Sequence, residues 1–316
     1  MKQRILLSCG DVNGIGPELI LKVFSNKNLI SQFDIKVIGP KRVFDFYSRL
    51  LKIKRIPENY FLDIAVPDNF SANPGKVDVI SGKTSGEAIK LGVDLCMKKY
   101  FDALVTLPIN KESLNLGGYN YRGHTEMLSH LTQSKNTFML MYSNMLKIIP
   151  VTIHIPVKKI SSAITKTKLI EKIININNVF VKTLKIRKPH IAVLSLNPHC
   201  GDGGLIGYEE KKIISPAISA LRKSGFNIEG PFSADGFFGS SLYKKFDVTI
   251  SMYHDQAMIP FKILSKESGV NFSGGLKIIR TSPAHGTAYD IAGKGIADIT
   301  STMEAIKLAG KLSVNY

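Results

Sequence analysis

The sequence contains very little cysteine. Its 316 residues include only Cys9, Cys96 and Cys200, an odd number with no CxxC pair. Secreted proteins that lack a large core depend on disulfide frameworks, whereas cytosolic proteins keep their thiols reduced. The cysteine content therefore argues against a disulfide framework and predicts reduced thiols in a cytoplasmic protein.

Long apolar runs are also missing. No stretch approaches the roughly 20 consecutive apolar residues that span a bilayer, so no membrane partner is expected. The start of the chain, MKQRILLSCG, loosely resembles a signal peptide that ends in a lipid-attachment cysteine. Its apolar run, residues 5–7, is far too short for the hydrophobic region of such a peptide, and we predict a buried first strand there instead.

The common phosphate-binding motifs are absent as well. Residues 201–207 read G-D-G-G-L-I-G, which has the wrong spacing for the dinucleotide motif G-x-G-x-x-G. Residues 82–84 end like a P-loop, but Val77 stands where the upstream glycine would be needed. A nicotinamide cofactor, if one is used, must be bound in another way.

Basic residues are abundant: the chain has 42 Lys and Arg against 25 Asp and Glu, a formal net charge of +17. Nucleic-acid binding would favour clustered basic residues with aromatics between them, but here they are spread along the chain. The densest stretch, residues 158–188, alternates Lys with Ile and Val, as solvated helix faces do. We expect no nucleic-acid partner; compositional bias and attraction of anionic small molecules both remain as explanations.

Short apolar, β-branched runs alternate with stretches of helical periodicity. Several runs are apolar at consecutive positions, which is typical of strands buried on both faces. The alternation predicts an α/β fold with a mostly parallel sheet, whose ligands gather beyond the carboxyl ends of the strands. The predicted strands are 5–8, 35–38, 103–107, 149–153, 191–196 and 248–252, and the main predicted helices are 18–24, 86–100, 125–131, 166–184 and 208–224.

Three of the seven histidines follow predicted strands. His154, His199 and His254 each come at or just past the carboxyl end of an apolar run. In one sheet such ends lie along one edge, where three imidazoles could bind Zn²⁺ or a similar divalent ion and leave positions for substrate. The alternative is that each histidine only makes local hydrogen bonds. Asp255 adjoins His254 and could orient it, serve as a base, or cap a helix.

Further polar residues suggest an anion site. His124 and Thr125 are predicted at the amino end of a helix, where backbone N–H groups attract anions. Lys262, Asn271 and Arg280 lie nine residues apart on sequence that looks weakly helical or loop-like. From composition alone, each of these three would be interpreted as a solvated surface residue.

Two segments resemble the β-decarboxylating dehydrogenases, the isocitrate and isopropylmalate group. Residues 10–18, G-D-V-N-G-I-G-P-E, are similar to the group's G-D-G-I-G-P-E with two residues inserted. Residues 285–298, H-G-T-A-Y-D-I-A-G-K-G-I-A-D, are similar to its adenine-binding loop. The resemblance implies that Asp290 binds the adenosine ribose and hence selects NAD, because a carboxylate repels the 2′-phosphate of NADP; NADP stays as the alternative.

The complete motif set is similar to a closer family, 4-hydroxythreonine-4-phosphate dehydrogenase. The motifs include L-P-I-N-K, G-H-T-E, L-N-P-H-x-G-x-G-G, M-Y-H-D-Q and I-R-T-S-x-x-H-G-T-A, which occur in the family's order between residues 10 and 298. The resemblance implies two α/β/α subdomains of the isocitrate/isopropylmalate dehydrogenase type with a cleft between them. We place a cofactor-side domain at 1–122 plus 258–316, and a metal-binding and dimerisation domain at 123–257.

The same resemblance assigns roles to individual residues. It implies one divalent ion, zinc first with magnesium or cobalt as alternatives, and a homodimer in which the partner supplies one of the histidine ligands. The implied metal ligands are His154, His199 and His254; the substrate contacts are His124, Thr125, Lys262, Asn271 and Arg280; the cofactor contacts are Gly14, His285, Gly286, Thr287, Asp290 and Asp298.

The implied reaction is the NAD-dependent oxidation and decarboxylation of 4-phosphohydroxy-L-threonine to 3-amino-2-oxopropyl phosphate, in pyridoxal 5′-phosphate biosynthesis. Related enzymes act on threonate or erythronate 4-phosphate, and the motifs do not separate these substrates. Asp235, Asp255 and Lys262 are the candidate general bases, although Asp235 lies in a turn-forming Ser-Ala-Asp-Gly sequence. Phosphate acyltransferases share the general architecture, but they need neither the three histidines nor the adenine loop.

Overall fold

The computed structural model describes residues 2–316 and divides them into two compact units. The first unit extends to Thr137 and resumes at Val270, and the second runs from Phe138 to Gly269. The sequence placed the boundaries at 122/123 and 257/258. The second of these would cut helix α11 (His254–Ser265) in the middle. Because the hydrogen bonds of a helix couple its residues, the division after Gly269 is physically the more reasonable one.

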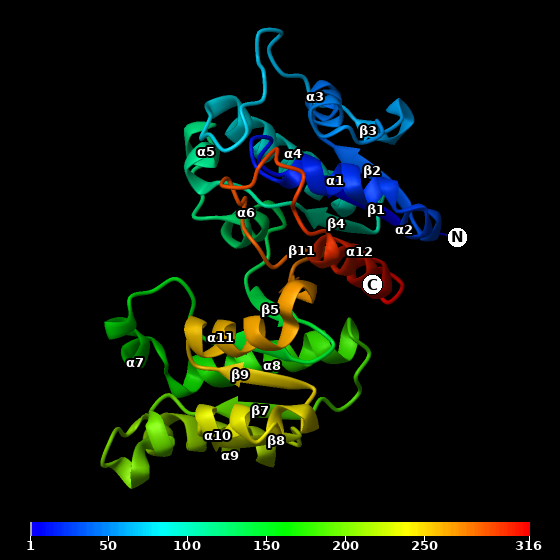
Figure 1. Cartoon of the computed structure of the whole chain (residues 1–316). Helices are drawn as coiled ribbons and strands as arrows, with labels where there is room; N and C mark the ends of the chain where they lie inside the picture. Colours follow the sequence, from blue (N-terminus) through cyan, green and yellow to red (C-terminus); the bar gives the residue numbers. More distant parts are fainter. Residues whose placement is uncertain (1) are drawn as a thin grey trace. The chain divides into compact units, whose positions relative to one another are not determined.

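The first unit is built on a mostly parallel sheet (Figure 1). Its strand order is β3-β2-β1-β4-β11-β10, and only the β10–β11 pair is antiparallel. All four residues of β4 are buried, and so are all but the first residue of β1, as expected for strands covered on both faces. The strands are β1 (Arg4–Ser8), β2 (Asp34–Ile38), β3 (Phe61–Leu62), β4 (Ala103–Thr106), β10 (Val270–Gly274) and β11 (Ile279–Pro283).

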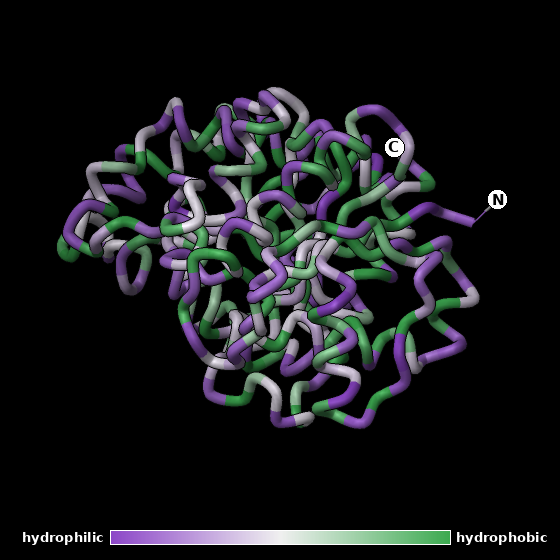
Figure 2. The backbone as a smooth tube through the Cα atoms, turned by 90° about the horizontal axis from the view of Figure 1, so that it is seen from above, coloured by the Kyte–Doolittle hydropathy of each residue, from purple (hydrophilic) through white to green (hydrophobic). Residues whose placement is uncertain are grey.

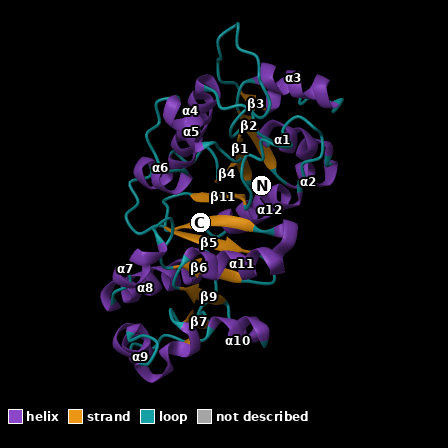
Figure 3. Ribbon diagram, turned by 60° about the vertical axis from the view of Figure 1, so that its left-hand side comes forward, coloured by secondary structure: helices purple, strands orange, loops and turns teal. Residues whose placement is uncertain are grey.

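Helices cover both faces of this sheet. In Figure 3, α4, α5 and α6 lie on one side of the strands, and α1, α2, α3 and α12 on the other. Side-chain caps fix several helix starts, because the oxygen of Asp78 accepts from Ser81 N and that of Asn110 accepts from Ser113 N. The helices are α1 (Gly16–Ser25), α2 (Lys27–Gln32), α3 (Lys41–Leu51), α4 (Val79–Met97), α5 (Lys111–Leu116), α6 (His124–Leu131) and α12 (Thr300–Ser313).

The strands of the second unit follow the order β5-β6-β9-β7-β8. Strands β6, β9, β7 and β8 are parallel to one another, and β5 is antiparallel to β6. Helices again flank the sheet on two sides (Figure 3). The elements are β5 (Phe138–Tyr142), β6 (Lys147–Pro150), β7 (Ile191–Leu194), β8 (Ile228–Phe232), β9 (Val248–Ser251), α7 (Ile160–Ala163), α8 (Lys166–Lys182), α9 (Ser215–Lys223), α10 (Ala234–Gly239) and α11.

The predicted α/β architecture with a mostly parallel sheet is confirmed, and each predicted strand overlaps an observed one. The prediction was wrong for the region around Asn271 and Arg280, which was interpreted as weakly helical or loop-like. Asn271 lies in β10 and Arg280 in β11. Polar residues interrupt both strands, so the apolar run that marks a buried strand is missing there, although every β11 side chain is buried.

No helix among residues 2–316 is long and apolar enough to cross a membrane. Hydrophilic segments recur along the whole chain in Figure 2. The sequence likewise spreads its Lys and Arg residues along the chain.

The contact between α4 and α5 gives a test of the packing. A Cβ atom added at Gly82 would lie 1.6 Å from Ser113 O, so Gly82→Ala should destabilise the protein by about 3 kcal/mol or more. Gly236→Ala is the control, because a Cβ at this position has no neighbour within 4 Å. This substitution should stabilise the protein by up to about 1 kcal/mol, because alanine has the higher helix propensity in α10. Denaturant unfolding of both variants measures this, and equal stability of the two would contradict the packing.

Candidate functional site

The most unusual charged group is Arg280, which is only 1% exposed on strand β11. Its guanidinium donates from Nε to Thr106 Oγ1 (3.0 Å) and from Nη1 to Ser273 Oγ (2.9 Å), and Nη2 also bonds Thr106. Among residues 2–316 no carboxylate forms an ion pair with it. Burial lowers the pKa of Arg280 to about 9. A buried cation that is held by hydroxyls alone lacks a counter-charge and is well suited to bind an anion.

Several further polar side-chain atoms of the first unit are buried without hydrogen-bond partners, and two of them belong to predicted substrate contacts. These two are Nε2 of His124, the first residue of α6, and Oδ1 of Asn271 on β10. Burial, and secondarily the charge of Arg280, holds the pKa of His124 well below its usual value, so the imidazole is neutral at neutral pH. Buried polar atoms are normally hydrogen-bonded, and these two therefore point to a ligand that supplies their partners.

The predicted substrate contacts thus divide between the units. His124, Thr125, Asn271 and Arg280 belong to the first unit, whereas Lys262 belongs to α11 of the second. His124 and Thr125 are the first two residues of α6, as predicted, and Gly123 precedes them as the N-cap. An anion is favoured at a helix amino end and beside a guanidinium, so the residue types in this part of the first unit suit an anionic ligand.

The predicted cofactor residues all belong to the first unit, and two of them, Gly14 and Thr287, lie close together. Ile15 N donates to Thr287 O (3.1 Å), and a Cβ on Gly14 would lie 3.0 Å from the same oxygen. The loop after β1 therefore contacts the loop that carries His285, Gly286 and Thr287. Asp290 is exposed on that loop, where a ribose could reach it. Asp298 instead accepts from Thr300 N (2.7 Å) at the start of α12, and hydrogen bonds from the side chain and then the backbone of Thr300 lower the pKa of Asp298.

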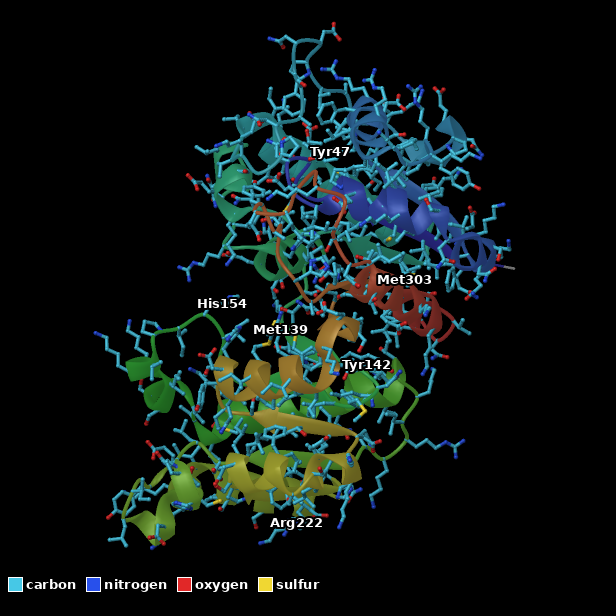
Figure 4. All side chains as sticks on the ribbon, in the orientation of Figure 1. Tyr47, Met139, Tyr142, His154, Arg222 and Met303 are labelled. Carbon is cyan, nitrogen blue, oxygen red and sulfur yellow. The ribbon has the colours of Figure 1, made fainter. Side chains whose placement is uncertain are left out.

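The three predicted metal ligands follow three adjacent parallel strands of the second unit. His154, His254 and His199 come after β6, β9 and β7, which are neighbours in that order. All three therefore lie at one edge of the sheet, as the sequence predicted. The rings of His154 and His254 are 5.9 Å apart between centroids, and Figure 4 shows His154 in the loop beyond β6.

Metal binding fits these residues in part. Imidazoles at the end of a sheet are suitable donors for zinc or a similar ion. The described part of the chain holds no group of three His, Cys, Asp or Glu that could bind a metal ion. One chain thus brings two of the predicted ligands, His154 and His254, close together. A three-histidine metal site would need a third imidazole close to these two.

The loop that carries His199 has an unusual backbone. Residues 199–203 all have positive φ angles, including those of the non-glycine residues His199 (50°), Cys200 (54°) and Asp202 (43°). Left-handed backbone costs about 1–2 kcal/mol for each non-glycine residue, so other contacts must hold the loop. The buried carboxylate of Glu210 does so, because it accepts from Leu196 N (2.7 Å) and from both the backbone and the side chain of Asn197 (2.8 and 2.9 Å).

The candidate bases differ in their surroundings. Asp255 Oδ1 lies 2.7 Å from His254 Nδ1, so this carboxylate orients the imidazole and leaves Nε2 for a ligand. Asp235 accepts from Ser233 Oγ at the start of α10, and this bond is the main reason that its pKa is lowered. A lowered pKa makes Asp235 a weaker base, which favours its local role. Lys262 is exposed on α11.

Sequence reasoning did not single out four residues that support the site: Thr106, Ser273, Glu210 and Lys172. Thr106 and Ser273 hold Arg280, and their role depends on a strand pairing that the sequence did not reveal. Lys172 lies on α8, and its Nζ donates to Val151 O just beyond β6 (2.8 Å). Burial lowers the pKa of Lys172 to about 8. The sequence surrounds Lys172 with other lysines, which hides its burial.

The uncompensated charge of Arg280 leads to a prediction about stability. Arg280→Met should leave the free protein as stable as the wild type or more stable by about 1–4 kcal/mol, because a buried ion without a counter-ion is removed. Inorganic phosphate should raise the Tm of the wild type but not that of the variant. Arg222→Met is the control, since Arg222 (Figure 4) donates only to the carbonyl of Ile228. A large loss of stability in Arg280→Met, with the phosphate effect retained, would contradict an anion site.

The support of the His199 loop can be tested by hydrogen exchange. Glu210→Gln weakens bonds to a charged acceptor, each worth about 1.5–3 kcal/mol, so amides of residues 196–204 should exchange roughly 10-fold or more faster. Glu209→Gln is the matched control, because Glu209 accepts from Asn197 Nδ2 and Ser161 but from no backbone N–H of residues 196 and 197. If both variants exchange equally, Glu210 has no special role in the loop.

Comparison with known proteins identifies the family to which the chain is similar. The family model described as pyridoxal phosphate biosynthetic protein PdxA matches residues 23–309. A 4-hydroxythreonine-4-phosphate dehydrogenase from Prosthecochloris aestuarii is 40% identical over 97% of this chain and 96% of its own length. A D-threonate 4-phosphate dehydrogenase from Salmonella typhimurium is 37% identical over 98% of both chains.

Solved structures give the same result. The crystal structure of 4-hydroxythreonine-4-phosphate dehydrogenase from Klebsiella pneumoniae is 34% identical, with a TM-score of 0.88 over 99% of this chain and 98% of that chain. A β-decarboxylating dehydrogenase from Thermococcus kodakarensis, 16% identical with a TM-score of 0.51 over 98% of this chain and 81% of that chain, shares the fold alone and confirms the predicted fold class. The chain therefore belongs to the family of the pyridoxal phosphate biosynthetic protein PdxA.

Proposed function

We propose that this protein is an NAD-dependent dehydrogenase that oxidises and decarboxylates 4-phosphohydroxy-L-threonine to 3-amino-2-oxopropyl phosphate, in pyridoxal 5′-phosphate biosynthesis. The observation that carries the proposal is the buried guanidinium of Arg280 without a carboxylate partner, in the same unit as the unpartnered Nε2 of His124 and Oδ1 of Asn271. A small substrate with anionic ends supplies the counter-charge and the hydrogen bonds that these groups lack.

A second candidate substrate is D-threonate 4-phosphate. Relatives with this name and relatives named for the amino acid phosphate match the chain at similar identity, 37% and 40%. Both substrates carry a phosphate, a carboxylate and an oxidisable hydroxyl, and they differ in whether an ammonium or a hydroxyl group stands at C2. Arg280 can pair with an anionic end of either, so the anion site supports the substrate class rather than the choice within it.

The proposed chemistry starts with loss of the C3 hydroxyl proton to a base and transfer of the C3 hydride to NAD, which yields a β-keto acid and NADH. The β-keto acid then loses its carboxylate as CO₂, and the electron pair left on C2 is protonated. Asp255 and Lys262 are the stronger candidates for the base, because Ser233 and the backbone lower the pKa of Asp235. Asp290, exposed on its loop, would accept from the ribose hydroxyls of NAD.

His154, His199 and His254 would hold one divalent cation, zinc or alternatively magnesium or cobalt, which supplies Lewis acidity toward the reacting hydroxyl. The pairing of His254 with Asp255 supports this assignment, since ligand imidazoles commonly bond a carboxylate through their other nitrogen. In the proposed homodimer, located in the cytoplasm, the partner subunit supplies one ligand. This arrangement accounts for a single chain that brings only two of the three imidazoles together.

The direct test is NADH formation by the purified protein with 4-phosphohydroxy-L-threonine, before and after chelation, with D-threonate 4-phosphate in parallel. We expect turnover of the amino acid phosphate that chelation abolishes and added divalent metal restores. Turnover of the threonate phosphate alone would keep the chemistry and change the substrate. No reduction of NAD or NADP with either compound would refute the proposal.

A pair of histidine variants tests the metal assignment. His199→Ala, at the carboxyl end of β7, should reduce kcat/KM by at least about 1000-fold, because a cation ligand is lost. His190→Ala, just before the amino end of β7, should keep near-normal activity, since the His190 imidazole bonds only Glu229 and the carbonyl of Lys245 there. Full activity in His199→Ala would exclude this residue as a ligand.

A further inference from the structure

A hydrogen bond ties the loop of residues 285–298 to the loop after β1. Tyr289 donates its hydroxyl to Asp11 Oδ2 (2.8 Å), and Asp11 is fully buried. The other oxygen, Asp11 Oδ1, accepts from Ser81 Oγ (2.6 Å) and from Asn13 N (2.9 Å). An ionised carboxylate only accepts hydrogen bonds, so Tyr289 is the donor, and it reaches an acceptor that the β1 loop and α4 already hold in place.

The far end of the same loop is held by α1. Glu18, fully buried, accepts from Ala297 N (2.8 Å) and Gly295 N (3.2 Å). Lys22, one turn further along α1, donates to the carbonyl oxygens of the same two residues (2.7 and 2.9 Å). Glu18 and Lys22 also form an ion pair with each other (2.8 Å). Together they bond the N–H groups and the carbonyl groups of both Gly295 and Ala297. The loop is anchored on both sides of the exposed residue Asp290.

These contacts set the conformation of the segment that carries the proposed ribose contact. Asp290 directly follows Tyr289, so the hydroxyl bond of Tyr289 restricts the backbone from which the Asp290 carboxylate projects. A loop that is already in its bound conformation loses less conformational freedom when a ligand binds, and its affinity is correspondingly higher. The phenol of Tyr289 also contacts a second hydroxyl, Ser113 Oγ (3.3 Å), on α5.

We propose that Tyr289 is a positioning residue for the dinucleotide, because its bond to buried Asp11 preorganises the loop 285–298 for the adenosine end of NAD. The inference rests on the proposed function, which makes this loop the cofactor loop. Tyr289 does not touch the reacting atoms in this role. Its loss therefore weakens cofactor binding and leaves the chemical step unchanged once the cofactor is saturating.

The test compares Tyr289→Phe with Tyr47→Phe. Tyr47 is a matched control because its buried hydroxyl donates to Val12 O (3.0 Å), in the same β1 loop, but makes no hydrogen bond to residues 285–298; Figure 4 labels it. Calorimetry measures the Kd for NAD⁺, kinetics give the KM values and kcat, and hydrogen exchange follows residues 286–297. The Tm of each variant reports any general loss of stability.

In Tyr289→Phe we expect a Kd and a KM for NAD⁺ raised about 10-fold, since a hydrogen bond to a charged group is lost. The value of kcat and the KM for the phosphorylated substrate should stay near those of the wild type, and amides of residues 286–292 should exchange faster. Tyr47→Phe should lower the Tm by a similar amount but leave the Kd unchanged.

Unchanged exchange and an unchanged Kd in Tyr289→Phe would overturn the inference, and so would an equal rise of the Kd in Tyr47→Phe. A wild-type protein that binds no dinucleotide would refute the proposed function, and the positioning role with it. A wild type that binds NAD⁺ as tightly as Tyr289→Phe refutes the positioning role alone. The two failures are thus distinguishable.

Discussion

A buried positive charge without a negative partner is the constraint on which the candidate site depends. Arg280 lies on β11, and all the observed hydrogen bonds of its guanidinium go to the hydroxyls of Thr106 and Ser273. Hydroxyls fix the direction of the guanidinium but do not neutralise it, so the charge stays available to a ligand. The same charge contributes to keeping His124 neutral, and a neutral imidazole can share an anion with a guanidinium without repelling it.

The remaining candidate groups depend on sheet topology. In each unit they follow the carboxyl ends of parallel strands, the edge where α/β proteins bind ligands. In the first unit, the loops after β1 and β11 are joined through Asp11, Tyr289, Glu18 and Lys22. In the second, the three histidines lie in the segments that directly follow β6, β9 and β7, and Glu210 holds the left-handed backbone around His199. Buried carboxylates thus hydrogen-bond the loops that follow the strands in both units.

The sequence predicted the features that depend on local pattern. Apolar β-branched runs located the parallel strands, and the position of His154, His199 and His254 after such runs correctly predicted a shared sheet edge. Features that depend on non-local pairing were not predictable. Arg280 looked like a surface residue, because its burial results from the pairing of β11 with β4 and β10, which places it beside Thr106 and Ser273. Likewise, nothing in the local sequence indicates that Tyr289 reaches Asp11, 278 residues away.

A crystal structure of the protein with bound 4-phosphohydroxy-L-threonine tests the central claim most directly. The account predicts that one anionic group of the substrate contacts both the guanidinium of Arg280 and Nε2 of His124, while Thr106 and Ser273 keep their bonds to Arg280. A substrate whose phosphate and carboxylate both bind elsewhere, with Arg280 still bonded only to the two hydroxyls, would contradict it.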